Sequence, residues 1–352
     1  MTVVILILLI GLGAANGAND VSKGVATLAG AGVTRYRTAI LWGAATTLAG
    51  ALLSIQLGRG MGKLFSKGIV SGTPTPAFAL AVLLGTLSWV ALASVAKLPV
   101  STTHAIVGSL VGAGLVLAPS TVQWSGVMQK VVLPLLLSIA VAYGVSLILA
   151  LVVHGLTRLV RRRGEPVAIP VPAGGGSTQV LAPPRIEPAS ETRVARFGFL
   201  DPVLAVLHWI SSGAASCARG LNDTPKIAAI GGFALLPAGY SATTVSLVVA
   251  AAMAAGSLVG IRVARTLGEK IVKMNHAEGF TANLTTATLV GAGALAAWPM
   301  STTHVSTGAI VGSAGGQLSR ISGRTLRDFL IAWTLTPAVA GVIGAIIFAA
   351  AR

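Results

Sequence analysis

The chain has 352 residues, of which 54% are hydrophobic and only 10% are charged. Soluble globular domains carry about 25% charged residues, so this composition excludes that class and predicts an all-α polytopic membrane protein. The formal net charge of +16 does not indicate a nucleic-acid partner. Basic residues of membrane proteins gather in loops that face the cytoplasm and anionic lipid, and the expected environment is therefore the lipid bilayer of the plasma (inner) membrane.

The N-terminal stretch "MTVVILILLIGLG" has no basic region before its apolar run. It therefore reads as a first membrane segment and not as a cleaved signal peptide. The single cysteine, Cys217, excludes an internal disulfide and a cysteine-ligated metal site. We expect no cofactor, and no metal beyond a transported Na⁺.

Apolar segments follow one another along two halves of the chain, and each half is expected to cross the membrane about five times. The first-half segments are a broken pair at 2–17 and 20–33, then 38–57, 77–97, 100–117 and 131–154. The second-half segments are 199–235, 240–261, 279–297, 300–316 and 328–350. Some of the short ones are candidates for re-entrant helices.

Residues 158–197 interrupt this pattern with proline, glycine and charge, including the run "RLVRRRGEP". This composition predicts a flexible linker, and its arginines place it in the cytoplasm. The linker divides the chain into an N-terminal membrane repeat, 1–157, and a C-terminal membrane repeat, 198–352.

The two halves share two motifs. "GANDVSKG" at 17–24 returns as "GLNDTPKI" at 220–227, and "PVSTTHAIVGSLVG" at 99–112 returns as "PMSTTHVSTGAIVG" at 299–312. The motifs are separated by nearly the same length of chain in both halves, which indicates an internal repeat.

Loop charges predict that the repeats have inverted topology. The loop with Arg320, Arg324 and Arg327 is expected inside, whereas the matching loop at 118–130 carries only Lys130 and is expected outside. Inverted repeats with broken or re-entrant helices are a common architecture of secondary transporters. One segment departs from the positive-inside rule, by which basic loops face the cytoplasm, because Arg59, Lys63 and Lys67 would face the outside.

The first motif places acids in apolar surroundings, where each charge costs about 2.5–3.5 kcal/mol at the membrane centre. Asp20 and Asp223 are therefore expected to face a polar cavity or each other. With Asn19, Asn222 and carbonyls freed by a local helix break, they would form an oxygen cage for a small cation or a proton. The motif residues Lys23 and Lys226 follow one turn later as charge-balancing groups. Arg219, just before the second copy, would steer anions or face the membrane surface.

The second motif is expected to bind an anion, whereas the first is expected to bind a cation or a proton. Pro99 and Pro299 end the preceding helix, and Ser101 and Ser301 are good N-caps. Helix starts of this kind present free N–H groups to an anion. The predicted ligands of a tetrahedral oxyanion are Ser101, Thr102, Thr103, Ser301, Thr302 and Thr303. His104 and His304 either cap and pack or set a pH dependence.

An anion and a cation that bind side by side make each other's binding possible, which predicts coupled transport. Three alternatives stay open at this point: transport of sulfate, which is also tetrahedral, a passive channel, and an intramembrane hydrolase that uses paired aspartates or Ser with His. The hydrolase is disfavoured because it needs no duplicated anion motif.

The stretches "GANDVSKGVATLAGAGV", "GLNDTPKIAAIGG" and the paired "P-x-STTH" resemble the PiT family of inorganic phosphate transporters over nearly all of both halves. The resemblance implies an inverted-repeat symporter of phosphate with Na⁺ or H⁺. We interpret the chain as a phosphate importer that works by alternating access of its two halves, with a homodimer as a plausible assembly. It implies phosphate at the Ser-Thr-Thr stretches and the cation at the Asn-Asp pairs. Lys23 stands where sodium-coupled members usually have Asn, which favours proton coupling.

Overall fold

The computed structural model describes residues 1–72, 74–163, 200–271 and 274–351. The regular elements in these ranges are all helices. Those of the first half are α1 (Thr2–Asp20), α2 (Ser22–Gly30), α3 (Tyr36–Leu57), α4 (Arg59–Lys63), η1 (Leu64–Gly68), α5 (Pro76–Val95), α6 (Thr102–Leu117), η2 (Pro119–Thr121), α7 (Trp124–Gly126), η3 (Val127–Val132) and α8 (Leu133–Arg163). Those of the second half are α9 (Leu200–Leu235), α10 (Ala242–Ser257), α11 (Ile261–Lys270), α12 (His276–Leu295), α13 (Thr302–Ser313), η4 (Leu318–Arg320) and α14 (Gly323–Ala351).

Several of these helices are long and apolar enough to cross a bilayer. Five segments in the described ranges meet this criterion by themselves: Thr2–Gly30, Tyr36–Leu57, Pro76–Val95, Trp124–Leu159 and Gly323–Ala351. A sixth is the pair α10 and α11, which is bent by 65°. The all-α polytopic membrane fold is confirmed. Two predicted crossings, α6 with 16 residues and α13 with 12, are shorter than the about 20 residues that span a bilayer.

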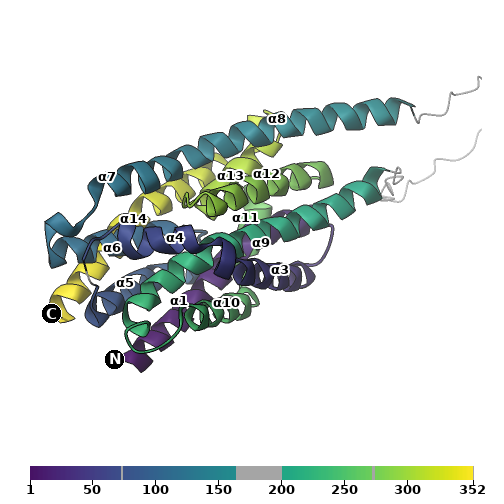
Figure 1. Cartoon of the computed structure of the whole chain (residues 1–352). Helices are drawn as coiled ribbons and strands as arrows, with labels where there is room; N and C mark the ends of the chain where they lie inside the picture. The colour runs from purple at the N-terminus through teal and green to yellow at the C-terminus, as the bar shows by residue number, and fades with distance from the viewer. Residues whose placement is uncertain (73, 164–199, 272–273, 352) are drawn as a thin grey trace, which may run out of the picture.

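Both chain termini lie at one end of the bundle, at the left of Figure 1. The last turn of α8 and the first turn of α9, which flank the predicted linker, lie at the opposite end. Consequently α8 and α14, which hold equivalent places in the two halves, run in opposite directions. Most of the predicted linker lies outside the described residues, and α8 continues as a helix to Arg163.

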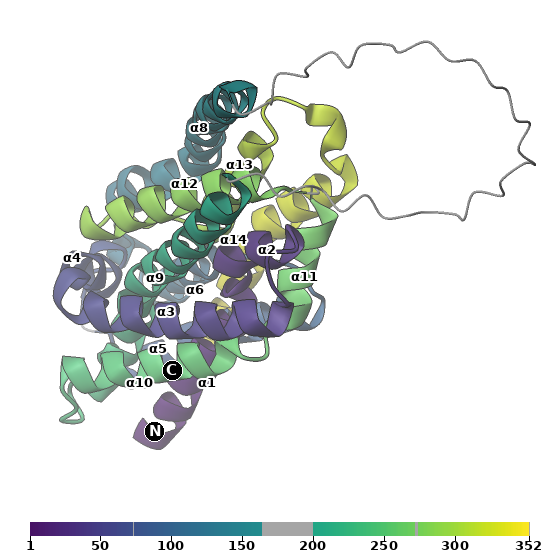
Figure 2. The same cartoon turned by 90° about the vertical axis from the view of Figure 1, so that its right-hand side faces the viewer.

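The halves interlock, because equivalent helices of each half pack against the other half. Gly17 of α1 lies against the backbone of Met253 in α10, and Gly220 of α9 lies against the backbone of Thr47 in α3. A Cβ atom at either glycine would overlap a carbonyl oxygen of the neighbouring helix. These contacts let α1 and α9 approach their partners closely enough to bring both copies of the first motif to the centre (Figures 1 and 2).

The glycines after the second motif make the same kind of contact. Gly108 of α6 lies against the backbone at Pro337 in α14, and Gly308 of α13 lies against the backbone at Ile139 in α8. Each short helix is therefore held by a long helix of the other half. The repeat that is visible in the sequence is also a repeat of helix contacts.

The turns that precede the short helices have equivalent backbone geometry. Lys97 and Ala297 both have positive φ, 62° and 56° respectively, directly after α5 and α12. The left-handed residue ends each helix in the way that glycine usually does. The chain then returns through Pro99 or Pro299 and starts α6 or α13 deep inside the bundle.

Candidate functional site

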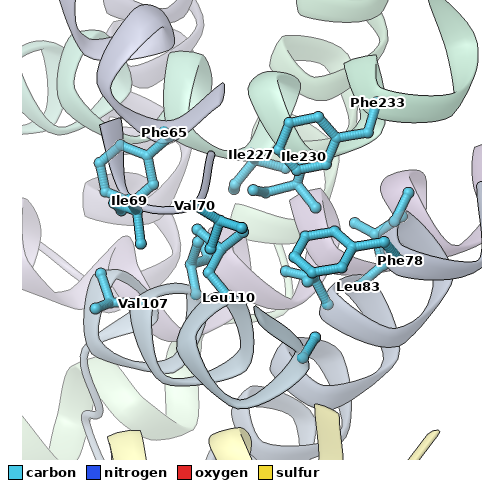
Figure 3. Packing of buried hydrophobic residues seen from close by; sticks show 14 of the residues in the cluster. Phe65, Ile69, Val70, Phe78, Leu83, Val107, Leu110, Ile227, Ile230 and Phe233 are labelled. Carbon is cyan, nitrogen blue, oxygen red and sulfur yellow. The ribbon is translucent and has the colours of Figure 1, made fainter. Parts of the chain in front are cut away.

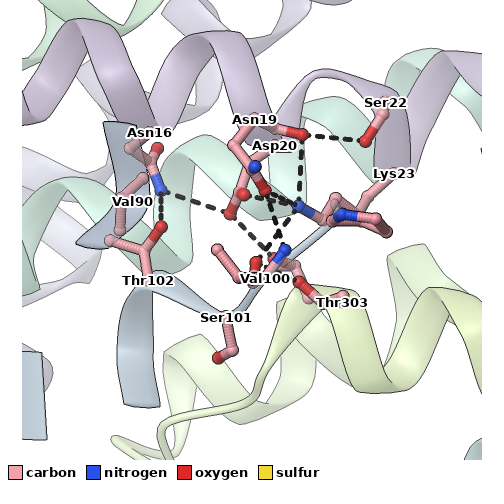
Figure 4. A network of polar contacts seen from close by, with 12 residues as sticks. Asn16, Asn19, Asp20, Ser22, Lys23, Val90, Val100, Ser101, Thr102 and Thr303 are labelled. Carbon is pink, nitrogen blue, oxygen red and sulfur yellow. Dashed lines mark hydrogen bonds and ion pairs between the residues drawn. The ribbon is translucent and has the colours of Figure 1, made fainter. Parts of the chain in front are cut away.

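Four segments meet at the centre of the molecule: the end of α1 with the start of α2, the middle of α9, and the N-termini of α6 and α13. All the residues that the sequence predicted for the site are buried there. They are Asn19, Asp20, Lys23, Ser101, Thr102, Thr103, Asn222, Asp223, Lys226, Ser301, Thr302 and Thr303. The sequence therefore identified residues that the fold brings together from both halves (Figure 4).

The first copy of the acid-base motif forms a compact pair. Lys23 Nζ lies 2.5 Å from Asp20 Oδ1 and donates to Asn19 Oδ1 at 2.9 Å and to the Asn19 carbonyl at 3.2 Å. The Val100 carbonyl lies 3.5 Å from the same nitrogen. The ammonium group is thus surrounded by the oxygen atoms that would otherwise be free to hold a small cation (Figure 4).

The second copy has a longer ion pair and also contacts the first half. Lys226 Nζ lies 3.3 Å from Asp223 Oδ1 and donates to the Met300 carbonyl at 3.2 Å. It also donates to Thr103 Oγ1 at 2.8 Å. Lys226 therefore links the acid of its own half to a predicted anion ligand of the other half.

The N-termini of α6 and α13 are capped as predicted. Ser101 Oγ accepts from the His104 N–H at 3.3 Å, and Ser301 Oγ accepts from the His304 N–H at 3.2 Å. Each serine satisfies one of the four amides that a helix start leaves free. The remaining first-turn amides and the helix dipoles keep the preference for an anion.

Further hydrogen bonds join hydroxyls of the second half to an acid and a backbone carbonyl of the first half. Thr302 Oγ1 donates to Asp20 Oδ2 at 3.3 Å, and Thr303 Oγ1 donates to the Val100 carbonyl at 2.8 Å. The predicted anion ligands and the predicted cation ligands thus share one buried network.

Asn16 belongs to this network, and the sequence interpretation missed it. Its Nδ2 donates to Thr102 Oγ1 at 3.0 Å, lies 3.2 Å from Asp20 Oδ2 and lies 3.5 Å from Asp223 Oδ2. Asn16 therefore bridges the two aspartates. The signal was present, because an asparagine inside an apolar run also needs a polar partner.

The predicted helix break occurs in one copy only. α1 ends at Asp20 and α2 begins at Ser22, whereas α9 runs without interruption through Asp223 and Pro225. The expected helix break is absent from the second copy, where only Pro225, which has no N–H, leaves a carbonyl of the motif without its helical donor. The carbonyls of Val100 and Met300 accept hydrogen bonds from the motif side chains instead. They lie in the turns before the short helices, and backbone in a turn does not form the regular hydrogen bonds of a helix.

Arg219 does not face the membrane surface, which was one of its two expected places. Its side chain is 1% exposed, and its Nη2 donates to Thr47 Oγ1 and, at 3.2 Å, to Ser257 Oγ. Its Nε and Nη1 have no hydrogen-bond partner among the described residues. The guanidinium interacts electrostatically with both Asp20 and Asp223. The buried centre therefore holds two carboxylates, two ammonium groups and a guanidinium, with a formal charge of +1.

The histidines of the two Ser-Thr-Thr-His motifs lie against each other. The His104 and His304 rings have centroids 4.5 Å apart, and His304 also packs on Trp333 at 4.4 Å. The contact between equivalent residues places them where the two halves meet.

Comparison with known proteins assigns the family. A model described as the phosphate transporter family matches residues 16–344. The chain belongs to the phosphate transporter family. Like its relatives, this family member is a transporter and not an enzyme, which removes the hydrolase alternative.

A relative from Rhizobium meliloti, named "Probable low-affinity inorganic phosphate transporter", is 29% identical over 96% of this chain and 92% of its own length. A relative from Pyrococcus horikoshii, named as a phosphate permease, is 30% identical over 98% and 97%. A solved structure titled "The sodium-dependent phosphate transporter" has the same fold, with a TM-score of 0.73, 22% identity and 99% of this chain covered.

Proposed function

We propose that this family member imports inorganic phosphate together with protons, by alternating access of two inverted halves around the central site. The observation that carries the proposal is the shared network, in which Thr302 contacts Asp20 and Lys226 contacts Thr103. An anion at the helix starts would lie within the electrostatic reach of both acid-base pairs, so binding and charge balance are coupled.

We assign phosphate to the N-termini of α6 and α13. Its ligands are Ser101, Thr102, Thr103, Ser301, Thr302 and Thr303, which are buried and drawn from both halves. Hydroxyl groups and free helical amides are donors, and donors suit a phosphate oxygen. The family name and the names of the relatives favour phosphate over sulfate.

The formal charge of the centre favours the monoanion as the ionic form of the substrate. Two carboxylates and three cations leave one positive charge, which a single dihydrogen phosphate anion neutralises. Dihydrogen phosphate is the hydrogen phosphate dianion plus one proton, so uptake of the monoanion carries a proton with each phosphate. Burial of a dianion would leave an uncompensated negative charge in a low-dielectric site, which is strongly unfavourable.

Lys23 argues against sodium in the first acid-base pair. Its ammonium occupies the oxygen cage of Asn19, Asp20 and Val100, so a sodium ion would have to displace a fixed charge. The matched variant Lys23→Asn removes that charge and leaves the cage open. Asn19, Asp20, Asn222 and Asp223 are proposed as the proton- or cation-linked groups, with Lys23 and Lys226 as their charge balance.

The test is uptake of labelled phosphate into proteoliposomes, with a sodium gradient and a pH gradient imposed separately. We expect the pH gradient to drive accumulation and the sodium gradient to have no effect. The apparent KM should stay constant with pH when it is expressed as monoanion, and should rise with pH when it is expressed as total phosphate. Lys23→Asn should create a sodium dependence.

Accumulation driven only by sodium in the unmodified protein would reject proton coupling. Equilibration without uphill accumulation would indicate a channel. Competition by sulfate stronger than competition by arsenate would replace phosphate with sulfate as the substrate.

The arrangement of the chain in the membrane is also proposed. Residues 1–157 and 198–352 form the two membrane repeats, and 158–197 form a linker on the cytoplasmic side of the plasma membrane. The opposite directions of α8 and α14 support the inversion (Figure 1). A homodimer is the assembly that the sequence interpretation proposed, and crosslinking in native membranes would test it.

A further inference from the structure

A second polar region lies outside the central site. A cavity of about 740 Å³ opens between α4, η1, α9 and α10. Its polar wall contains three basic residues, Arg59, Lys63 and Lys67, which recur at four-residue intervals and are all exposed. Residues at this spacing lie on one side of a helix, so the three charges form a single row along the cavity.

The positive charge of this row is not neutralised nearby. No acidic residue is present among the described residues that line the cavity. The sequence from Val21 to Gly164 contains no aspartate or glutamate at all. The hydrogen bond that the structure gives Arg59 goes to the neutral side chain of Gln56, at 2.8 Å. The cavity therefore has a wall of free positive charge beside an apolar wall from α9, a combination that focuses an electric field.

The inner end of the cavity lies close to the central site. Pro225, which lines the cavity, directly precedes Lys226. Phe65 is buried and directly precedes Ser66, which lines the cavity, and its ring lies 6.0 Å from Lys226 Nζ. Lys226 in turn donates to Thr103 Oγ1 at 2.8 Å. The cavity wall at Pro225 is therefore adjacent in the chain to Lys226, which contacts a proposed phosphate ligand.

Phe65 belongs to a buried apolar cluster that also contains residues of α9. Phe65, Ile227, Ile230 and Phe233 are buried in one cluster, and Figure 3 shows them within the same group of packed apolar side chains. Phe65 lies in η1, a single-turn π-helix that also carries Lys67. π-helical turns are frequent at functional sites, because the extra residue locally loosens the helix.

We propose that this cavity is an anion-binding vestibule, in which Arg59, Lys63 and Lys67 concentrate phosphate before it passes Phe65 to the central site. The proposal rests on the proposed function and adds the place where the substrate is first held. It also explains why these three basic residues do not follow the positive-inside pattern, because their proposed role is to attract phosphate. A phosphate group of a lipid has the same chemistry, and we assign the cavity to the free anion because its inner end leads to Lys226.

The vestibule is tested with the triple variant Arg59→Gln, Lys63→Gln and Lys67→Gln in full-length protein. The three side chains are exposed, so the fold should be retained. We expect the apparent KM for phosphate at low ionic strength to rise by about tenfold with an unchanged maximal rate. The two proteins should converge at 1 M salt, where the screening length falls to about 3 Å. Phe65→Ala should alter the maximal rate and leave this salt dependence in place.

The control removes three exposed basic residues that do not line the cavity, with Arg35→Gln, Arg37→Gln and Arg324→Gln. It keeps the same net charge as the test variant, and its KM should match that of the unmodified protein. An equal rise of KM in both triple variants would overturn the vestibule, because total charge would then explain the effect.

Three further outcomes separate this proposal from its alternatives. If the test variant differs from the unmodified protein only in vesicles that contain an anionic lipid, and not in vesicles of phosphatidylcholine alone, the cavity holds lipid and the proposal is wrong. If the unmodified protein transports phosphate and the test variant has an unchanged KM at every salt concentration, the vestibule fails and the proposed function stands. If the unmodified protein transports no phosphate, the proposed function itself fails.

Discussion

The two copies of the Asn-Asp motif have the same residue types at the same spacing and yet occupy different environments. In the first copy, Lys23 is enclosed by oxygens, most of them from its own motif, and lies 2.5 Å from Asp20. In the second copy, Lys226 lies 3.3 Å from Asp223 and reaches Thr103 of the other half. The lysine of the first ion pair is bonded within its own half, whereas the lysine of the second connects its ion pair to a proposed anion ligand of the other half. A duplicated sequence thus supplies two roles from one pattern.

The residues that precede the motifs differ in type. Asn16 and Arg219 hold equivalent positions, three residues before Asn19 and Asn222. The neutral Asn16 bridges the two aspartates, and the charged Arg219 points to hydroxyls of α3 and α10. The repeat is therefore symmetric in its acids and asymmetric in its net charge.

The largest expected effect comes from neutralising the acids. Asp20→Asn and Asp223→Asn should each reduce phosphate uptake in proteoliposomes by at least about a hundredfold, because each leaves a buried ammonium without its carboxylate. Asp20→Asn should also lower the thermal stability in detergent more than Asp223→Asn does, since its ion pair is the shorter one. Uptake at the unmodified rate in either variant would remove that aspartate from the coupling mechanism.

The next effect concerns the helix contacts that bring the copies together. Gly17→Ala and Gly220→Ala should each cost about 3 kcal/mol or more, because the added Cβ meets a backbone carbonyl that cannot move by a rotamer change. Gly144→Ala is the control, since a Cβ there meets nothing within 4 Å. Thermal unfolding in detergent measures all three, and a control that unfolds as early as Gly17→Ala would contradict the packing argument.

A smaller effect is expected from substitution of Arg219, the charged residue that stands where the first half has Asn16. Arg219→Gln should lower phosphate uptake by about tenfold, which corresponds to about 1.4 kcal/mol, because the centre loses the positive charge that balances the anion. Arg219→Lys keeps the charge and should restore most of the rate. The protein yield and unfolding temperature of both variants show whether the change acts through folding, and equal loss in Gln and Lys variants would indicate a packing role alone.

The smallest expected effect lies in the matching turns of the two halves. Lys97→Gly and Ala297→Gly should each stabilise the protein by about 1 kcal/mol, because glycine adopts positive φ without the steric cost that other residues have. Unfolding temperatures that fall in one variant and rise in the other would show that the two turns are not equivalent.

The sequence by itself determined the all-α membrane fold class, and its repeated motifs identified the polar residues that the fold buries together. Hydropathy and loop charge are properties of single segments, and the Ser caps at Ser101 and Ser301 depend only on neighbouring residues, so these predictions need no tertiary information. The burial of Asp20 and Asp223 also followed from the cost of placing charge in apolar surroundings.

Only the tertiary structure decided which groups meet. The contact of Thr302 with Asp20, the bridging role of Asn16 and the burial of Arg219 depend on how helices of one half pack against the other. The break at Val21 in one copy and its absence at Asp223 in the other have the same origin. Such contacts join residues that are far apart in the chain, and close packing at glycines fixes them, so no local pattern of residues encodes them.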